Sequence, residues 1–453
     1  MFDSEEIVEA VRRYLGEPSR TFRWMPVEFN LASIEVVALV ETGEFDRAIA
    51  RCRLGSQQGC LNAVFSIVRH EGGSLGAEEI FEMREVPLID ALLRSTTFRG
   101  PLASQVADAL ERSDGDSFAV PLQLDQTNSA FLLGETGFGK FYRRCGENTR
   151  EARLYAMLGD SPAVSRYWGS FYGDDSAVVA TVVDRVRDAS SAWDIAMGIV
   201  REQSSDASAK LRELIYDCGV LLGRLHDDLS QAQGDGAIVS KQAFANWIKA
   251  RLELEDLDAG VVHIRHASAL QEYAIELSRC VAQLWGRWPS FEIHGDFHLG
   301  QIVKGSRGLV AIDFEGEPLA DAGAMDLPER DLAGLLRSIG YLVAVGSRGS
   351  KLSRSLAAEL RGAALAGYSR SRVGERWMAE PSSVALLGCL EVEKAIYEYL
   401  YESRFRPEML SIPAEFLARV SEHLTELPSR CVAVGDGTGE RSLRALIVAE
   451  YAL

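Results

Sequence analysis

Three polar side chains that lie close together in the sequence could carry out phosphoryl transfer. Asp296, Gln301 and Asp313 place a carboxylate, an amide and a second carboxylate in that order. Kinases use an Asp to position the acceptor hydroxyl, and the Asn of an Asp-x4-Asn motif with a further Asp to bind magnesium. Here Gln301 stands where Asn is usual. A chance Asp-x4-Gln with a structural Asp is the alternative.

The expected local structure would bring these side chains together. We predict a strand over 291–293, which would place Asp296 on a loop at a strand end. The segment 305–308 has the composition of a tight turn, and 309–312 has the pattern of a buried strand. Such a hairpin folds the chain back, so that Gln301 and Asp313 could face one magnesium ion.

A lysine on an upstream strand could bind the phosphates of ATP. Two apolar segments flank a turn at 135–137 and predict a hairpin, with Lys140 on its second strand. Kinases use such a lysine for the α- and β-phosphates, oriented by a Glu on the next helix. The predicted helix 148–158 offers Glu151, which we prefer to Glu147. The alternative is that the lysine and the glutamate are ordinary surface residues.

Two further groups of residues could contact the nucleotide. Thr127, Asn128 and Ser129 precede the hairpin and could donate hydrogen bonds to phosphates in place of the usual Gly-rich loop, although a simple turn is the alternative. The apolar run 177–183 predicts a central buried strand. We expect Asp184, which follows it, to offer its backbone carbonyl to adenine.

A predicted helix near the C-terminus has a face that is both aromatic and charged. The residues that share this face at helical spacing are Lys394, Tyr397, Glu398, Tyr401 and Arg404. A core helix would be apolar there. Aromatic rings beside hydrogen-bonding groups suit a sugar, so we predict that this face binds the acceptor. The alternative is an amphipathic surface helix.

Three histidines accompany these elements. His226 lies in the predicted helix 211–229, and we interpret it as a packed core residue. We expect His294 to brace the loop of Asp296. His298 lies within that loop, where a structural hydrogen bond and a contact to substrate are both open.

Composition excludes several classes of protein. The chain has 453 residues, 48 Lys and Arg, 66 Asp and Glu and a net charge of −18, which disfavours nucleic acids and anionic membranes as partners. No apolar run is long enough to cross a membrane. The seven cysteines are scattered and indicate reduced thiols in the cytoplasm. We expect a monomer whose partners are a small-molecule sugar and ATP.

The order of the predicted elements indicates three domains and an α+β, bilobal, protein-kinase-like fold. Residues 1–100 form an accessory domain, with a strand at 33–40 and a strand pair within 57–70. Residues 101–186 form a strand-rich nucleotide-binding lobe. Residues 187–453 form a helical lobe that contains the hairpin.

Together these motifs resemble those of the maltokinases, relatives of the aminoglycoside phosphotransferases. His-Gly-Asp-Phe-His-Leu-Gly-Gln (294–301) and Asp-Phe-Glu-Gly-Glu-Pro (313–318) are similar to that family's most specific motifs, and 330–338 and 393–407 are similar to its later ones. Met409 departs from the pattern, since Trp is expected there. The connector 319–329 is also shorter and more acidic than expected.

The resemblance implies phosphorylation of maltose by ATP and Mg2+ at the anomeric hydroxyl, for α-glucan synthesis. It implies that 1–100 is a cap domain, and we assign His298 and Glu315 to the substrate site. A glucosamine or aminoglycoside kinase is the alternative, because a cationic acceptor would suit the acidic chain. An alternative of another class is a non-catalytic regulator that binds a nucleotide or a glucan.

Overall fold

The structure is a computed structural model in which the chain forms two compact units, residues 1–185 and 186–453. It describes residues 2–17, 31–41, 47–56, 59–79, 93–112, 119–122, 129–146, 149–173, 176–202, 204–234, 237–239, 289–317, 327–347, 354–379 and 383–422.

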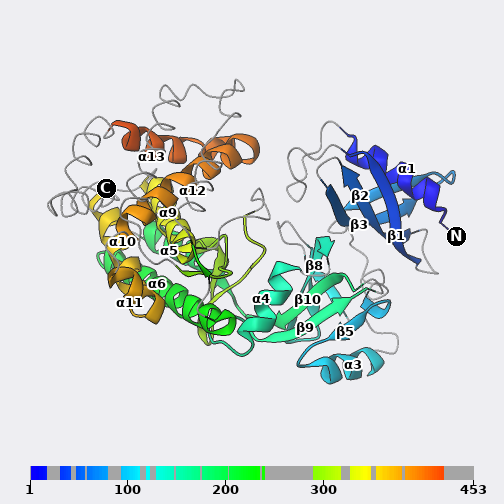
Figure 1. The fold of residues 1–453 in the computed structure, drawn as a ribbon, viewed down its shortest axis with the longest axis horizontal. Coiled ribbons are helices and arrows are strands. Elements are labelled where there is room, and N and C mark those ends of the chain that lie inside the picture. Colours follow the sequence, from blue (N-terminus) through cyan, green and yellow to red (C-terminus); the bar gives the residue numbers. More distant parts are fainter. Residues whose placement is uncertain are drawn as a thin grey trace. The chain divides into compact units, whose positions relative to one another are not determined.

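The first unit begins with a helix on an antiparallel sheet (Figure 1). The elements are α1 (Ser4–Leu15), β1 (Ser33–Glu41), β2 (Arg47–Ser56), β3 (Gly59–Arg69) and β4 (Leu75–Glu79). Asp3 caps α1 by accepting hydrogen bonds from the N–H groups of Glu5 and Glu6, and the helix buries Ile7 and Val11. The strand expected at 33–40 is confirmed as β1. The strand pair expected within 57–70 is wrong, because 59–69 is one strand, whose residues 59–68 pair with β2.

The remainder of the first unit continues the same sheet. Its elements are β5 (Thr97–Arg99), α3 (Ala103–Arg112), β6 (Ala119–Leu122), β7 (Ser129–Leu133), β8 (Gly137–Gly146), α4 (Arg150–Leu158), β9 (Tyr167–Tyr172) and β10 (Val178–Asp184). The strand order is β1-β2-β3-β8-β10-β9-β5, with β4 on β3 and β6-β7 on β8. The strands β3 and β8 pair through Asn62 with Cys145 and Ala63 with Arg144. The domain boundary expected at residue 100 remains a prediction.

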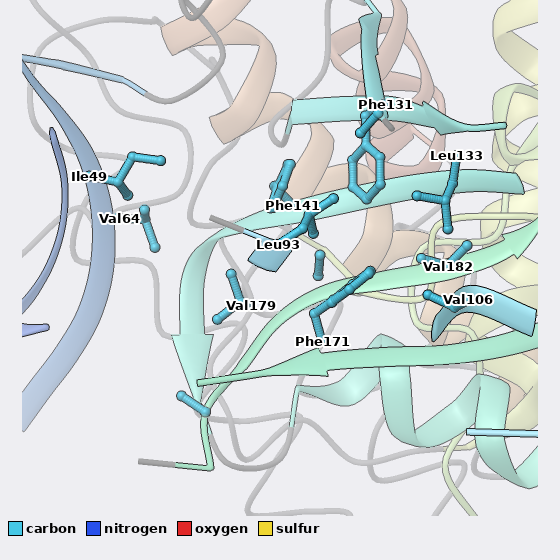
Figure 2. Close-up of a cluster of buried hydrophobic side chains, with 13 residues drawn as sticks. Ile49, Val64, Leu93, Val106, Phe131, Leu133, Phe141, Phe171, Val179 and Val182 are labelled. Carbon is cyan, nitrogen blue, oxygen red and sulfur yellow. The ribbon is translucent and has the colours of Figure 1, made fainter. Parts of the chain in front are cut away.

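One hydrophobic core joins strands from both parts of this unit (Figure 2). Ile49 of β2 and Val64 of β3 belong to the same buried cluster as Phe131, Phe141 and Phe171. The rings of Phe131 and Phe141 lie 4.6 Å apart between centroids. The expected central strand is confirmed as β10, whose residues are buried from Val178 to Val183. Strand β8, which carries Lys140, is therefore held by side-chain packing as well as by backbone hydrogen bonds to its neighbouring strands.

The second unit is mostly helical. Its elements are β11 (Ser190–Ser191), α5 (Ala192–Glu202), α6 (Ala207–Gln233), β12 (Ala237–Ile238), β13 (Pro289–Ser290), η3 (Leu299–Gln301), β14 (Ile302–Gly305), β15 (Gly308–Ala311), α9 (Pro328–Ser347), α10 (Arg354–Tyr368), α11 (Arg372–Ala379), α12 (Ser383–Phe405), η4 (Pro407–Met409) and α13 (Ser411–Glu422). Helix α10 packs on α6, and α12 packs on α9. The predicted hairpin is confirmed as β14 and β15.

The strand expected over 291–293 is wrong. Only Pro289–Ser290 forms a strand there, paired with β12. The backbone of Glu292 is instead bonded by a side chain: Gln233 Nε2 donates to its carbonyl at 3.0 Å, and its N–H donates to Gln233 Oε1 at 2.7 Å. The Gln233 amide thus replaces a neighbouring strand, and an apolar pattern cannot reveal such a partner.

Two helices of the second unit approach each other unusually closely. A Cβ on Gly219 of α6 would collide with the carbonyl oxygen of Ala364, and one on Gly367 of α10 would collide with that of Tyr216. The two glycines therefore permit contact between the helix backbones and fix α10 against α6.

In the described part of the chain, no helix has both the length and the apolar character needed to cross a membrane. Among the described residues, Cys52, Cys218 and Cys389 are buried free thiols, and the expected reduced state remains a prediction.

Candidate active site

The loop that carries Asp296 is held through its backbone. Gly295 has a φ of 87°, a left-handed conformation that favours glycine. The N–H groups of His294 and Gly295 each donate to the Asp331 carboxylate at 2.8 Å. Asp331 lies in the first turn of α9. This carboxylate therefore fixes the two residues that immediately precede Asp296.

His294 ties the same loop to the hairpin, as the sequence predicted. Its Nε2 lies 2.8 Å from the Ile312 carbonyl oxygen, and its Nδ1 accepts from the Asp296 N–H at 3.3 Å. Since a carbonyl only accepts, the proton lies on Nε2. Burial lowers the pKa of His294, which keeps the ring neutral. One neutral imidazole thus links the backbone of Asp296 to the residue before Asp313.

The Asp296 carboxylate is ionised and has two neighbours. Lys394 Nζ donates to Oδ1 at 3.0 Å, and His298 Nε2 lies 3.8 Å from Oδ2. Burial alone would raise the pKa of Asp296, but Lys394 and His298 outweigh it and lower the pKa to about 2. His298 Nδ1 accepts from the Gly300 N–H at 3.0 Å, so its proton lies on Nε2 and faces Asp296.

Oxygen donors suited to magnesium gather at the end of the hairpin. Gln301 Nε2 donates to Asp313 Oδ2 at 2.9 Å, so the predicted pair is in contact. Asp313 has a φ of 67°, a left-handed backbone that Asp tolerates better than most residues. Glu315, assigned to the substrate site from the sequence, has a carboxylate oxygen within 4.8 Å of one of Asp313. Magnesium prefers such hard oxygen ligands, so the residues fit the ion.

The predicted acceptor face of α12 is partly engaged in buried ion pairs. Lys394 Nζ donates to Glu317 at 2.6 Å as well as to Asp296, and both carboxylates raise its pKa although burial opposes them. Arg337 of α9 donates to Glu398 Oε2 through two nitrogens, at 2.9 and 2.6 Å.

The aromatic residues of this face form a row along the helix. The rings of Tyr397 and Tyr401 stack at 6.3 Å, and Tyr401 lies 4.9 Å from Phe405. Lys394 Nζ lies 4.9 Å from the centroid of the Tyr397 ring. Arg404, by contrast, is exposed. Lys394 thus contacts both Asp296 and the Tyr397 ring, and the assignment of the whole face to the acceptor remains a prediction.

The predicted nucleotide residues lie in the first unit. Lys140 Nζ lies 3.0 Å from Glu151 Oε2, with side chains 11% and 3% exposed. A Cβ on Gly139 would collide with the Phe131 ring, so glycine is needed beside this lysine. The predicted pairing of Lys140 with Glu151 is thus found in the structure, while Glu147 lies outside the described residues.

The other residues predicted to contact the nucleotide are Asp184, Ser129, Thr127 and Asn128. The Asp184 side chain accepts a hydrogen bond from Trp168 Nε1 at 2.7 Å, and the expected contact of its backbone carbonyl with adenine remains a prediction. Ser129 begins β7. Thr127 and Asn128 lie outside the described residues.

We expect Lys140→Met to affect both stability and activity. The change removes the ammonium that faces buried Glu151, which should lower the free energy of unfolding by about 3 kcal/mol. Loss of a cation at the phosphates should lower kcat/KM for ATP about a hundredfold. The double variant Lys140→Met/Glu151→Gln should recover most of the stability and none of the activity, as measured by thermal unfolding and steady-state kinetics. Recovery of activity in the double variant would contradict a role in binding phosphate.

Several residues around Asp296 were not assigned from the sequence. Glu317 binds Lys394 and also Arg330, whose Nη2 lies 3.3 Å away. Asp331 holds the loop, and Arg337 holds Glu398. The four unassigned residues lie within segments that carry the family resemblance, but nothing in their spacing assigns a partner to any of them. They are Glu317, Arg330, Asp331 and Arg337. The available signal was the presence of charged residues in a run that is otherwise apolar.

The chain is similar in sequence to known glucosamine kinases. No protein-family model matches the chain. A glucosamine kinase of Mycolicibacterium smegmatis is 24% identical over 312 residues, which cover 65% of this chain and 77% of that protein. A glucosamine kinase of Streptacidiphilus jiangxiensis is 28% identical over 235 residues, which cover 48% of this chain and 53% of that protein.

Solved structures give the same result at the level of fold. A glucosamine kinase in crystal form B has a TM-score of 0.61 and 19% identity, covering 91% of this chain and 99% of its own. A glucosamine kinase in complex with glucosamine, ADP and inorganic phosphate has a TM-score of 0.56 and 18% identity, covering 93% of this chain and 99% of its own.

The chain has a kinase-type fold. The predicted α+β protein-kinase-like architecture is thereby confirmed. The predicted reaction class, a phosphotransferase with an alcohol group as acceptor, is confirmed by the glucosamine kinases that are similar in sequence. Membership of the maltokinases is not shown by these comparisons.

Proposed function

We propose that this chain is an ATP-dependent sugar kinase whose acceptor is glucosamine or a closely similar amino sugar. The observation that carries the proposal is that the two relatives described above are glucosamine kinases, and the matched segment extends over 65% of this chain in the first. The net charge of −18 also suits a cationic acceptor. Maltose, the acceptor implied by the motifs, has no support from the comparisons and becomes the alternative.

Asp296 would orient the acceptor hydroxyl. Its pKa of about 2 makes it a weak base, so it would hold the hydroxyl by a hydrogen bond and take the proton late. That behaviour suits a loose transition state, in which positioning and charge neutralisation supply most of the catalysis. Since Lys394 occupies Oδ1, the hydroxyl would bind at Oδ2, on the side of His298.

The phosphates of ATP would be bound by Lys140 and by a magnesium ion. Lys140, oriented by Glu151, would bind the α- and β-phosphates of ATP. Gln301 and Asp313 would hold magnesium, with Glu315 as a further oxygen donor. The ion, when bound, neutralises the negative charge of the phosphates.

The acceptor is tested by turnover with ATP and magnesium. We expect phosphorylation of glucosamine, with a kcat/KM at least tenfold above that of maltose, kanamycin or N-acetylglucosamine. The last compound is a matched control, because acetylation removes the charge of the amine and leaves the ring hydroxyls in place. Turnover of maltose but not of glucosamine would reject the proposed acceptor, and failure to consume ATP with any sugar would favour the non-catalytic regulator.

A further inference from the structure

We propose that Tyr368 and His226 are positioning residues for the loop of Asp296 and act on it through Asp331. Neither side chain belongs to the residues that would touch ATP or the sugar. The inference rests on the proposed function, because it assumes that Asp296 orients the acceptor hydroxyl.

For a neutral His226 ring, chemistry fixes the direction of each hydrogen bond in this chain of side chains. Asp331 Oδ2 lies 3.0 Å from His226 Nε2, and the same carboxylate accepts the two N–H groups of the loop. An ionised carboxylate only accepts, so the His226 proton lies on Nε2. His226 Nδ1 is then an acceptor, and the Tyr368 hydroxyl, 3.0 Å away, donates to it.

Because these three side chains are buried, each of their polar atoms needs a hydrogen-bond partner within the protein. Tyr368 and His226 are 0% exposed and Asp331 is 1% exposed. Burial alone would raise the pKa of Asp331, but His226, His294 and the Gly295 N–H together outweigh that effect and lower the pKa, so the carboxylate stays charged. In such surroundings water cannot replace a lost partner. Removing the Tyr368 hydroxyl therefore leaves His226 Nδ1 without its donor, and the imidazole loses the contact that fixes its orientation toward Asp331.

A change in the orientation of the imidazole would act directly on the loop. If the ring shifts to find another partner for Nδ1, its Nε2–H donates less well to the Asp331 carboxylate. Asp331 would then hold the N–H groups of His294 and Gly295 less firmly, and Asp296 follows them directly. The loop would become less ordered, although the Asp296 side chain itself is unchanged.

The packing around Tyr368 keeps the hydroxyl in place. Tyr368 is the last residue of α10, and His226 lies on α6. The close contact at Gly219 and Gly367 fixes these helices against each other. The Tyr368 ring also meets His226 edge-on at 5.6 Å between centroids. A phenylalanine would keep these ring contacts, so the substitution Tyr368→Phe removes only the donor.

The kinetic test compares two buried hydroxyls of the same unit. We expect Tyr368→Phe to lower kcat about tenfold while KM for ATP and for glucosamine changes less than twofold, with kcat normalised to folded protein. Tyr399 on α12 is the matched control, because its hydroxyl is also buried but has no hydrogen-bond partner among the described residues. Tyr399→Phe should keep wild-type kcat. Equal kcat in the two variants would overturn the proposal.

A second test uses His226 and covers the case in which Tyr368→Phe folds poorly. A glutamine can donate through Nε2 and accept through Oε1, so His226→Gln can restore both hydrogen bonds, whereas His226→Phe restores neither. We expect His226→Gln to retain at least ten times the kcat of His226→Phe. Similar kcat values for the two folded variants would also overturn the proposal.

A third measurement requires no turnover and separates this inference from the proposed function. Hydrogen–deuterium exchange followed by mass spectrometry should show faster exchange of the peptide covering 291–299 in Tyr368→Phe and no change there in Tyr399→Phe. Unchanged exchange of this peptide in Tyr368→Phe would overturn the positioning role. Inactivity of the wild-type protein toward glucosamine would instead reject the proposed acceptor and leave the exchange result standing.

Discussion

Asp296→Asn should lower kcat by about a thousandfold or more, because the variant keeps the shape of the side chain and loses its charge and basicity. The Asn carbonyl can still accept from Lys394, and Lys394 keeps its contact with Glu317, so the fold should be preserved. KM for ATP should change less than threefold, since the change leaves the nucleotide residues intact. Steady-state kinetics and thermal unfolding provide both measurements.

The control for this variant is an aspartate outside the site. Asp217 is exposed on α6, and Asp217→Asn should keep wild-type kcat. A value for Asp296→Asn within tenfold of wild type would contradict the assignment of Asp296 to the acceptor hydroxyl. That result would not change the assignment of the fold, because the fold rests on the match to solved structures.

Asp313→Asn should lower kcat by about a thousandfold at a fixed magnesium concentration, since the loss of a charged oxygen ligand weakens the hold on the ion. The concentration of magnesium that gives half-maximal activity should rise at least tenfold. Asn tolerates the left-handed backbone found at this position, with its φ of 67°, so the local conformation should persist. A magnesium titration of turnover measures the effect.

Asp188 supplies a matched control for Asp313. It is an exposed aspartate of the same unit with a φ of 50°, so Asp188→Asn tests the same change on a similar backbone. We expect wild-type kcat and magnesium dependence from this control. An unaltered magnesium requirement in Asp313→Asn would show that Asp313 is not a ligand.

The sequence predicted the parts of the site that depend on local order. Gln301 and Asp313 are joined by a short hairpin, and Lys140 and Glu151 by a strand and the helix after it, so turn composition and apolar patterns were enough to place each pair. The central strand β10 was equally clear, because a short, nearly continuous apolar run is typical of a strand that is buried on both faces.

Long-range partners could not be predicted in the same way. Lys394 and Asp296 are 98 residues apart in sequence, and Asp331 lies 36 residues from the Gly295 N–H that it binds. Hydrophobic patterns carry no information on such polar pairs. The strand wrongly expected at 291–293 has the same cause, because Gln233, 59 residues from Glu292, satisfies the backbone there.

The pairing of β3 with β8 makes the first hundred residues difficult to remove. A shortened chain beginning at residue 101 would leave backbone groups of Arg144 and Cys145 unpaired at an open sheet edge. It would also remove Ile49 and Val64 from the core that supports Phe141. We therefore expect the N-terminal strands and the strand of Lys140 to melt in a single cooperative transition, and evolution could not readily exchange one without rebuilding the other.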